Sequence, residues 1–270
     1  MNDKSKPVAI QIEALTKKYG EFTALDSLNL DIPSACIFGL LGTNGAGKST
    51  AIKILTTLLD ATAGSAIVAG FDVSTDPIEV RRRIGYVPQM LSADGGLSAV
   101  ENLALSASLY GLTGAIRKER IQEALIFAGL EAVGDHLVRT YSGGMIRRLE
   151  IAQATMHRPE VLFLDEPTIG LDPVARKTVW DRLLTMKATT GMSILLTTHD
   201  MEEADYLCDE LAILHHGRLT VVGRPSDLKK NISPTASLSD VFTAYCGGVI
   251  EQGGHYREIR ETRVTAQRLG

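Results

Sequence analysis

The residues with the clearest chemical potential are the glycines, lysine and hydroxyls of GTNGAGKST. Closely spaced glycines let backbone N–H groups turn toward an anion. Lys48 would place a positive charge beside the β- and γ-phosphates of a nucleotide, and the Ser49 hydroxyl is a Mg²⁺ ligand. A glycine-rich turn without a ligand is the simpler alternative. The predicted phosphate-binding residues are Gly42, Thr43, Asn44, Gly45, Ala46, Gly47, Lys48, Ser49 and Thr50.

The elements on either side of this loop favour phosphate binding. The preceding segment 35–41, ACIFGLL, is continuously apolar, as in a buried strand. The following segment, KSTAIKILTTLL, has apolar residues at helical spacing, including Ile52, Leu55, Leu58 and Leu59. A helix that begins near Gly47 would add the positive end of its dipole to the site.

Two carboxylates follow a second apolar segment, VLFL at 161–164. Asp165, at the end of this strand, would hold the metal's water shell. Glu166 is placed to accept a proton from an attacking water, and partial burial is expected to raise its pKa. Asp-Glu-Pro after an apolar run is common at strand ends, but downstream of a phosphate loop the catalytic interpretation is favoured.

A second helix start carries anion-binding residues in YSGGM, residues 141–145. Ser142 is a good N-cap, and Gly143 and Gly144 leave backbone amides accessible. An ordinary serine cap is the local alternative. The position of YSGGM between the phosphate loop and VLFLDEP favours an anion-binding role for this segment.

Five motifs occur in the order and spacing of the ABC ATPase family, and the resemblance covers about residues 8–230. They are GTNGAGKST, GYVPQ, YSGGM, VLFLDEPTIGLDP and TTHDMEEAD. The resemblance implies that the chain binds ATP and Mg²⁺ and hydrolyses ATP. Tyr19 then stacks on adenine, Gln89 senses Mg²⁺ and water, and His199 contacts the γ-phosphate. Asp172 lies in the loop that crosses a dimer interface.

The family resemblance also assigns roles across a head-to-tail homodimer. ATP lies between the phosphate loop of one copy and Ser142, Gly143 and Gly144 of the other. The implied catalytic residues are Lys48, Glu166 and His199. The implied metal-binding residues are Ser49, Gln89 and Asp165.

Three residues depart from the commonest family pattern. Tyr141 and Met145 replace Leu and Gln of the signature, and Ile169 replaces a small polar residue. Together with LSDVFTAYCGG near the C-terminus, these residues resemble the daunorubicin-exporter-like branch. That resemblance implies an exporter motor in which ATP-dependent dimer closure drives a separate transmembrane permease. The permease is expected to dock near the Gln89 loop and the helical insertion.

The remaining patterns predict the elements that position these motifs. VAIQIEAL, residues 8–15, is expected to be an edge strand, 193–198 a central strand, and LAILHHGRLTVVG a hairpin turning near His216. We predict an α/β P-loop NTPase fold with a mixed, mostly parallel sheet, an antiparallel β edge and an inserted α-helical subdomain at about 90–157. The ATPase domain is expected to span 1–230, with a short extension at 231–270.

Composition argues against several classes of protein. The net charge is −4, a poor footprint for nucleic-acid binding, and the three cysteines support neither a disulfide framework nor a zinc site. No signal peptide or membrane-spanning run is visible, so we expect a cytoplasmic protein held at the inner face of the membrane by its permease.

Three other functions fit the sequence less well. An ATPase of translation or DNA repair usually carries two cassettes, a coiled coil or zinc inserts, which are not visible here. An importer ATPase often carries a longer C-terminal domain. A nucleotide switch without hydrolysis is disfavoured by the presence of Lys48, Asp165, Glu166 and His199.

Overall fold

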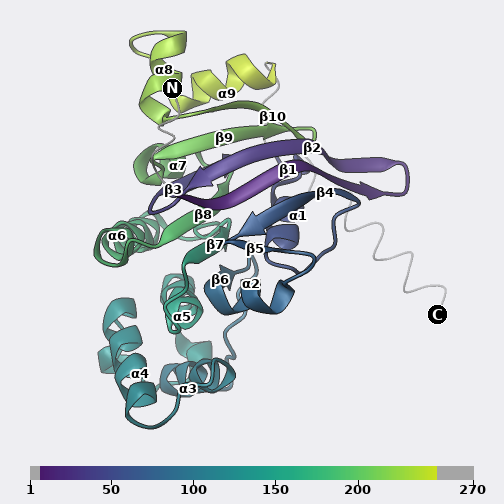
Figure 1. Cartoon of the computed structure of the whole chain (residues 1–270). Helices are drawn as coiled ribbons and strands as arrows, with labels where there is room; N and C mark the ends of the chain where they lie inside the picture. Colours follow the sequence, from purple (N-terminus) through teal and green to yellow (C-terminus); the bar gives the residue numbers. More distant parts are fainter. Residues whose placement is uncertain (1–6, 248–270) are drawn as a thin grey trace, which may run out of the picture.

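The computed structural model describes residues 7–247, which form two sheets flanked by helices (Figure 1). The first sheet is antiparallel with strand order β2-β1-β4-β5. Its strands are β1 (Val8–Tyr19), β2 (Phe22–Pro33), β4 (Ala63–Val68) and β5 (Phe71–Asp72). The prediction of an edge strand at 8–15 is wrong, because β1 pairs with β2 on one side and β4 on the other. The alternation in VAIQIEAL reflects one buried face and does not distinguish an edge from an interior strand.

The second sheet has six strands in the order β10-β9-β3-β8-β7-β6. All of its pairings are parallel except that of β9 with β10, which confirms the mixed, mostly parallel sheet. Its strands are β3 (Ile37–Leu41), β6 (Ile84–Val87), β7 (Val161–Asp165), β8 (Ser193–Thr198), β9 (Glu210–His215) and β10 (Arg218–Gly223). Because the carboxyl ends of parallel strands share one edge, the motifs after β3, β7 and β8 meet there.

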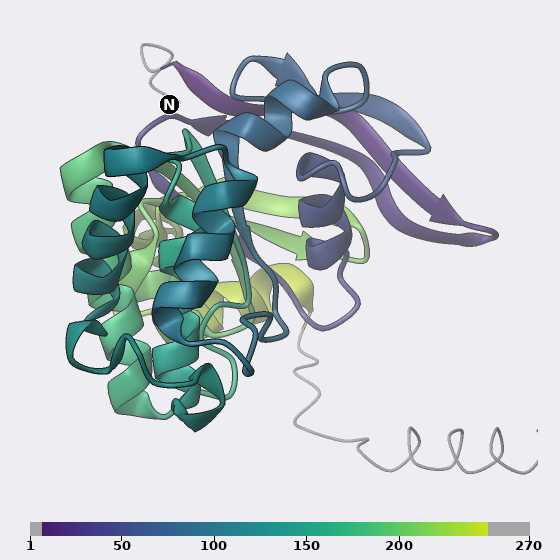
Figure 2. The same ribbon diagram turned by 90° about the horizontal axis from the view of Figure 1, so that it is seen from below.

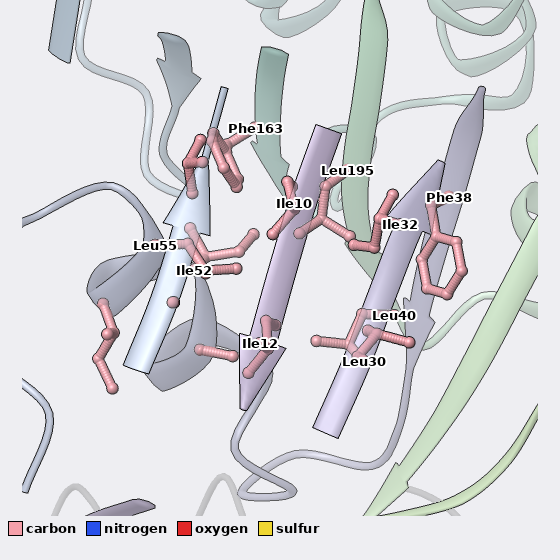
Figure 3. Packing of buried hydrophobic residues seen from close by; sticks show 14 of the residues in the cluster. Ile10, Ile12, Leu30, Ile32, Phe38, Leu40, Ile52, Leu55, Phe163 and Leu195 are labelled. Atoms are coloured by element: carbon pink, nitrogen blue, oxygen red, sulfur yellow. The ribbon is translucent and has the colours of Figure 1, made fainter. Parts of the chain in front are cut away.

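Side chains on the central strands alternate between two apolar clusters. Phe38, Leu40, Phe163 and Leu195 pack against the antiparallel sheet and the first helix, α1 (Lys48–Leu55), as Figure 3 shows. The intervening residues face a second cluster, built with helices on the opposite side of the sheet. Burial on both faces explains why the strand sequences are continuously apolar.

Helices cover the remaining surfaces of the sheets. They are α2 (Pro77–Arg83), α6 (Pro173–Thr190), α7 (Met201–Leu207), α8 (Pro225–Ile232) and α9 (Leu238–Cys246). Helix α1 ends four residues earlier than expected, because the Thr56 hydroxyl bonds back to Ile52 O and Thr57 adopts φ +62°. Leu58 is consequently 60% exposed instead of lying on the buried face of a longer helix.

A three-helix group lies between β6 and β7 in the chain and has its own apolar cluster. It contains α3 (Ala99–Leu109), α4 (Gly114–Ala128) and α5 (Gly143–Thr155), with short 3₁₀ turns at Glu131–Val133 and Val138–Thr140. Figures 1 and 2 show it projecting to one side of the sheets. A capping box formed by Ser98 and Glu101 begins α3.

Among residues 7–247, no helix combines the length and apolarity needed to cross a bilayer. The polar segment 249–270, in which the sequence predicts a tail or docking element, lies outside the described residues.

Candidate nucleotide-binding and catalytic site

The glycine-rich loop connects β3 to α1, as the sequence predicts. Gly47 caps the helix with φ +107°, and a Cβ there would lie 2.5 Å from Ala24 O. Both its left-handed backbone and this close approach require glycine. Thr43, Asn44 and Gly45 are exposed, whereas Ala46 and Lys48 are buried. The loop therefore presents accessible backbone beside the first turn of α1.

Lys48 folds back over this loop. Its Nζ donates to Gly42 O at 2.8 Å and Thr43 O at 3.3 Å, and lies 3.2 Å from Glu166 Oε1. The side chain is only 5% exposed. A buried ammonium between the phosphate loop and β7 can bind an anion without prior desolvation.

Two hydroxyl groups donate hydrogen bonds to Asp165. Its Oδ1 accepts hydrogen bonds from Ser49 Oγ at 3.1 Å and from Thr197 Oγ1 at 2.6 Å. Within the described residues, no cluster of His, Cys, Asp or Glu forms a complete metal cage. One hydroxyl and one carboxylate nevertheless fit Mg²⁺, which usually takes one or two protein oxygens together with substrate phosphates and water.

Glu166 lies between Lys48 and His199. Its Oε2 is 2.8 Å from His199 Nδ1, and its backbone has φ +49°. The expectation of a raised pKa is wrong for this structure. Burial favours the protonated form, but the hydrogen bond from His199 and the charges of Lys48 and His199 outweigh it and lower the Glu166 pKa. The same hydrogen bond raises the pKa of His199.

The other predicted residues lie apart from this cluster. Tyr19 ends β1 and is 50% exposed, while Gln89 is exposed in the loop after β6. Ser142 caps α5 by accepting from Met145 N at 3.3 Å. Asp172 caps α6 by accepting from Val174 N and Ala175 N, both at 3.0 Å. Within the described chain, none of them is hydrogen-bonded to the phosphate loop.

The packing of Gly144 joins two of these remote elements. A Cβ at Gly144 would lie 2.7 Å from Ala175 Cβ, and one at Gly143 would lie 3.3 Å from Leu171 Cδ2. The start of α5 thus packs directly on the start of α6. The Ser142 segment and the Asp172 cap form one surface, separate from the phosphate loop in the same chain.

The family model of the ABC transporter matches residues 25–169, which contain the phosphate loop, Ser142 and Asp165. The chain belongs to the ABC transporter family. It is 44% identical to the daunorubicin/doxorubicin resistance ATP-binding protein DrrA of Streptomyces peucetius, over 83% of this chain and 68% of that protein. It is 42% identical to the Nod factor export ATP-binding protein I of Ralstonia nicotianae, over 83% and 69% of the two chains.

Solved ABC structures have the same fold. The ATP-binding subunit of an ABC transporter aligns with TM-score 0.78 and 29% identity, covering 88% of this chain and 99% of that one. An ATP-binding cassette solved as a dimer after hydrolysis, with ADP and Pi, aligns with TM-score 0.71 and 28% identity, over 80% and 98% of the chains. The chain is therefore an ABC transporter ATP-binding subunit of the drug-exporter branch, and an ATPase.

One residue of this ABC site, Thr197, and two supporting residues beside it, Glu203 and Arg176, were not predicted from the sequence. Thr197 is fully buried and contacts both acidic residues, since its Oγ1 also accepts the Glu166 N–H at 3.0 Å. Glu203, on α7, accepts from Thr168 Oγ1 at 2.6 Å and from Trp180 Nε1 at 3.0 Å. Arg176 pairs with Asp200 at 2.6 Å.

Two of these residues leave only a weak signal in the sequence. Thr197 is a hydroxyl at the end of an apolar strand, and Glu203 is an acid on the buried face of a short helix. Burial raises the pKa of Glu203, although hydrogen bonds from Thr168, Thr198 and Trp180 oppose the shift. Buried polar groups that bond to a motif from another element have no local pattern of their own.

Proposed function

We propose that this chain is the motor of an exporter, in which two copies close head to tail on ATP and thereby drive a separate transmembrane permease. The observation that carries the proposal is the meeting of Lys48, Ser49, Asp165, Glu166 and His199 at one edge of the parallel sheet. These groups suit triphosphate binding and water activation. The names of the relatives DrrA and the Nod factor export protein favour export.

Each polar group at this edge has a distinct task. Lys48 and the N-terminus of α1 would bind the β- and γ-phosphates, and Tyr19 would stack on adenine. Ser49 and Asp165, with Gln89, would hold Mg²⁺, which neutralises phosphate charge when bound.

Glu166 is the proposed general base. Its lowered pKa keeps it ionised at neutral pH, as a base must be. It would take a proton from the water that attacks the γ-phosphorus, while the bond from that phosphorus to the β–γ bridging oxygen breaks to give ADP and phosphate. A triphosphate would compete for Lys48, which is paired with Glu166 here. His199, whose side chain is 49% exposed, would contact the γ-phosphate.

The second binding surface would come from the partner copy. Ser142, Gly143 and Gly144 begin α5, a helix of 13 residues whose N-terminal dipole favours an anion. Asp172 lies in the adjoining surface. Since neither segment contacts the phosphate loop of its own chain, a second copy is the natural source of these groups.

The permease would dock beside the Gln89 loop and the helical group. Met90 and Leu109 are 80% and 79% exposed, and Leu91 and Leu105 are 49% and 51% exposed. A contiguous apolar surface is typical of a protein interface, so these four side chains are the proposed contacts with the permease. Docking there would hold the ATPase at the inner face of the cell membrane.

We also propose that residues 1–230 form the ATPase domain, with the insertion at about 90–157 and an extension from 231. Support for the insertion comes from the separate apolar cluster of α3, α4 and α5. Helix α9, by contrast, buries Leu238, Val241 and Phe242 in the cluster beneath the parallel sheet. The extension is therefore expected to stabilise the main domain.

Co-purification from detergent-solubilised membranes tests the proposal. The full chain should retain a co-expressed polytopic permease without a solute-binding protein. Met90→Asp should lose the permease yet keep the ATP turnover of the isolated chain. Ile232→Asp, at a 40% exposed position on α8 and outside the helical group, is the matched control and should retain it. Association with ribosomes or a DNA-repair complex instead would overturn the assignment.

A further inference from the structure

Two buried charged residues of α5 hold the loop that contains Gln89. Arg147 and Glu150 are one helical turn apart, and each side chain is only 2% exposed. Arg147 Nη1 donates to Pro88 O at 2.7 Å, and its Nη2 donates to Gln89 O at 2.8 Å. The guanidinium therefore binds the backbone on both sides of the Gln89 Cα.

Glu150 binds the other end of the same loop. Its Oε1 accepts the N–H of Ser92, the Ser92 hydroxyl at 3.1 Å and the N–H of Ala93 at 3.3 Å. Among residues 7–247, all backbone hydrogen bonds of segment 88–93 are made to these two side chains. The loop is attached to α5 rather than to the strand edge beside which it lies.

Stability alone does not explain why a charged pair is buried here. Arg147 Nη1 and Glu150 Oε2 are 3.0 Å apart, but Arg147 Nε and Glu150 Oε2 have no hydrogen-bond partner. Burying such a pair costs desolvation free energy, and apolar side chains of similar size often serve stability as well or better. What the pair supplies is a fixed position of the loop relative to the helix.

Helix α5 connects this attachment to the signature segment. It begins at Gly143, directly after the cap Ser142, and continues without interruption to Thr155. Because the backbone hydrogen bonds of α5 are continuous over this span, a displacement at Arg147 would carry the first turn of the helix with it. Gln89 would face ATP bound by its own chain, whereas Ser142 would face ATP bound by the partner.

We propose that Arg147 and Glu150 are positioning residues that make the Gln89 loop and the Ser142 segment move as one unit. This inference rests on the proposed head-to-tail dimer and deepens it. Nucleotide at one site of the dimer then sets the position of the signature segment at the other. The pair thus links the two ATP sites through each chain.

A dimerisation titration tests this link in the full chain. Glu166→Gln serves as the background, into which Arg147→Met, Arg147→Lys or Arg148→Met is introduced. Arg148 is the matched control, because it lies next to Arg147 but donates to Ala128 O on α4. Dimer fraction is measured against ATP by size exclusion with light scattering, and ATP affinity of the monomer is measured with a fluorescent analogue.

Arg147→Met removes both charge-assisted hydrogen bonds to the Gln89 loop, so it should need about tenfold more ATP, or more, for half-maximal dimer, with monomer affinity changed less than about twofold. Arg147→Lys should be intermediate, and Arg148→Met should match the background. An ATP dependence of Arg147→Met equal to that of Arg148→Met overturns the proposal. An equal loss of monomer affinity also overturns it, because it indicates a merely structural role.

Amide hydrogen exchange provides a second test, made at a protein concentration below that at which ATP induces the dimer, so that any change at 142–146 arises within one chain. Adding ATP and Mg²⁺ should change exchange at both 88–93 and 142–146 in the background chain, but only at 88–93 after Arg147→Met. The near-isosteric Glu150→Gln serves if Arg147→Met does not fold. A change confined to 88–93 in the background itself contradicts the link. Absence of any ATP-induced dimer would instead contradict the proposed function, and exchange would still decide the role of Arg147.

Discussion

The Thr197 hydroxyl on β8 donates to Asp165 Oδ1 on β7 across 2.6 Å and accepts the Glu166 N–H at 3.0 Å. One buried side chain thus fixes both the proposed metal ligand and the proposed base. Thr197→Val keeps the volume but removes both bonds. We expect a loss of about 1–2 kcal/mol in unfolding free energy, and about tenfold more Mg²⁺ for half-maximal ATPase activity.

Urea denaturation and a Mg²⁺ titration of ATP turnover measure these two effects. Thr198→Val is the control on the same strand, because its Oγ1 accepts from Asp200 N rather than serving Asp165. An unchanged Mg²⁺ requirement in Thr197→Val would show that Asp165 needs no support from β8.

Replacing the proposed base should stop turnover after ATP binding. In Glu166→Gln the amide cannot take the proton of water, so ATP should remain bound and the closed dimer should accumulate. Light scattering with and without ATP measures this. Hydrolysis at the normal rate would assign the base to another residue.

The pairing of Glu166 with His199 predicts a window of pH dependence in the nucleotide-free chain. The Glu166 pKa is lowered, so its contribution to stability is present above the unfolded value of about 4.3 and is lost as pH falls through the folded value. The His199 pKa is raised, so its contribution is complete below about 6.5 and is lost as pH rises through the folded value.

The pair should therefore stabilise most between about pH 4.3 and 6.5. Urea denaturation of wild type and His199→Gln across this range measures the difference, which should shrink above it. NMR titration should show a lower His199 pKa in Glu166→Gln. A His199 pKa that is equal in both proteins would mean that the 2.8 Å contact does not persist in solution.

Lys48→Ala should abolish ATP hydrolysis and weaken ATP binding, because it removes the buried charge beside the phosphate loop. It also removes one of the charges that lower the Glu166 pKa. Lys53→Ala, at an exposed position on α1, is the control and should keep both properties. Turnover assays and calorimetric ATP titration measure the effects, and normal turnover by Lys48→Ala would refute the phosphate-loop assignment.

Ser142→Arg should bind ATP as a monomer but fail to dimerise or hydrolyse it, because a large side chain would fill the space proposed for the partner's triphosphate. Ser142→Ala separates this effect from loss of the helix cap, which costs about 1 kcal/mol. Size-exclusion chromatography measures dimerisation of both variants, and an ATP turnover assay measures their hydrolysis. Persistent activity in Ser142→Arg would contradict a site shared between two copies.

The sequence alone determined the motifs, their order and the class of fold. Those features follow from local physics: glycines permit the phosphate loop, continuous apolar runs form the buried strands, and Ser142 and Asp172 cap helices. The sequence also predicts the hairpin at His216 and Gly217, because turn residues lie there between two strand patterns.

Only the tertiary structure decided which side chains meet at the site. Strand order places β8 between β3 and β7, so Thr197 reaches Asp165 and His199 reaches Glu166 although each pair is far apart in the chain. The direction of the Glu166 pKa shift also depended on the structure, because burial and neighbouring charges oppose each other. The attachment of Arg147 and Glu150 to the Gln89 loop was hidden for the same reason: contacts between distant elements depend on how the elements pack.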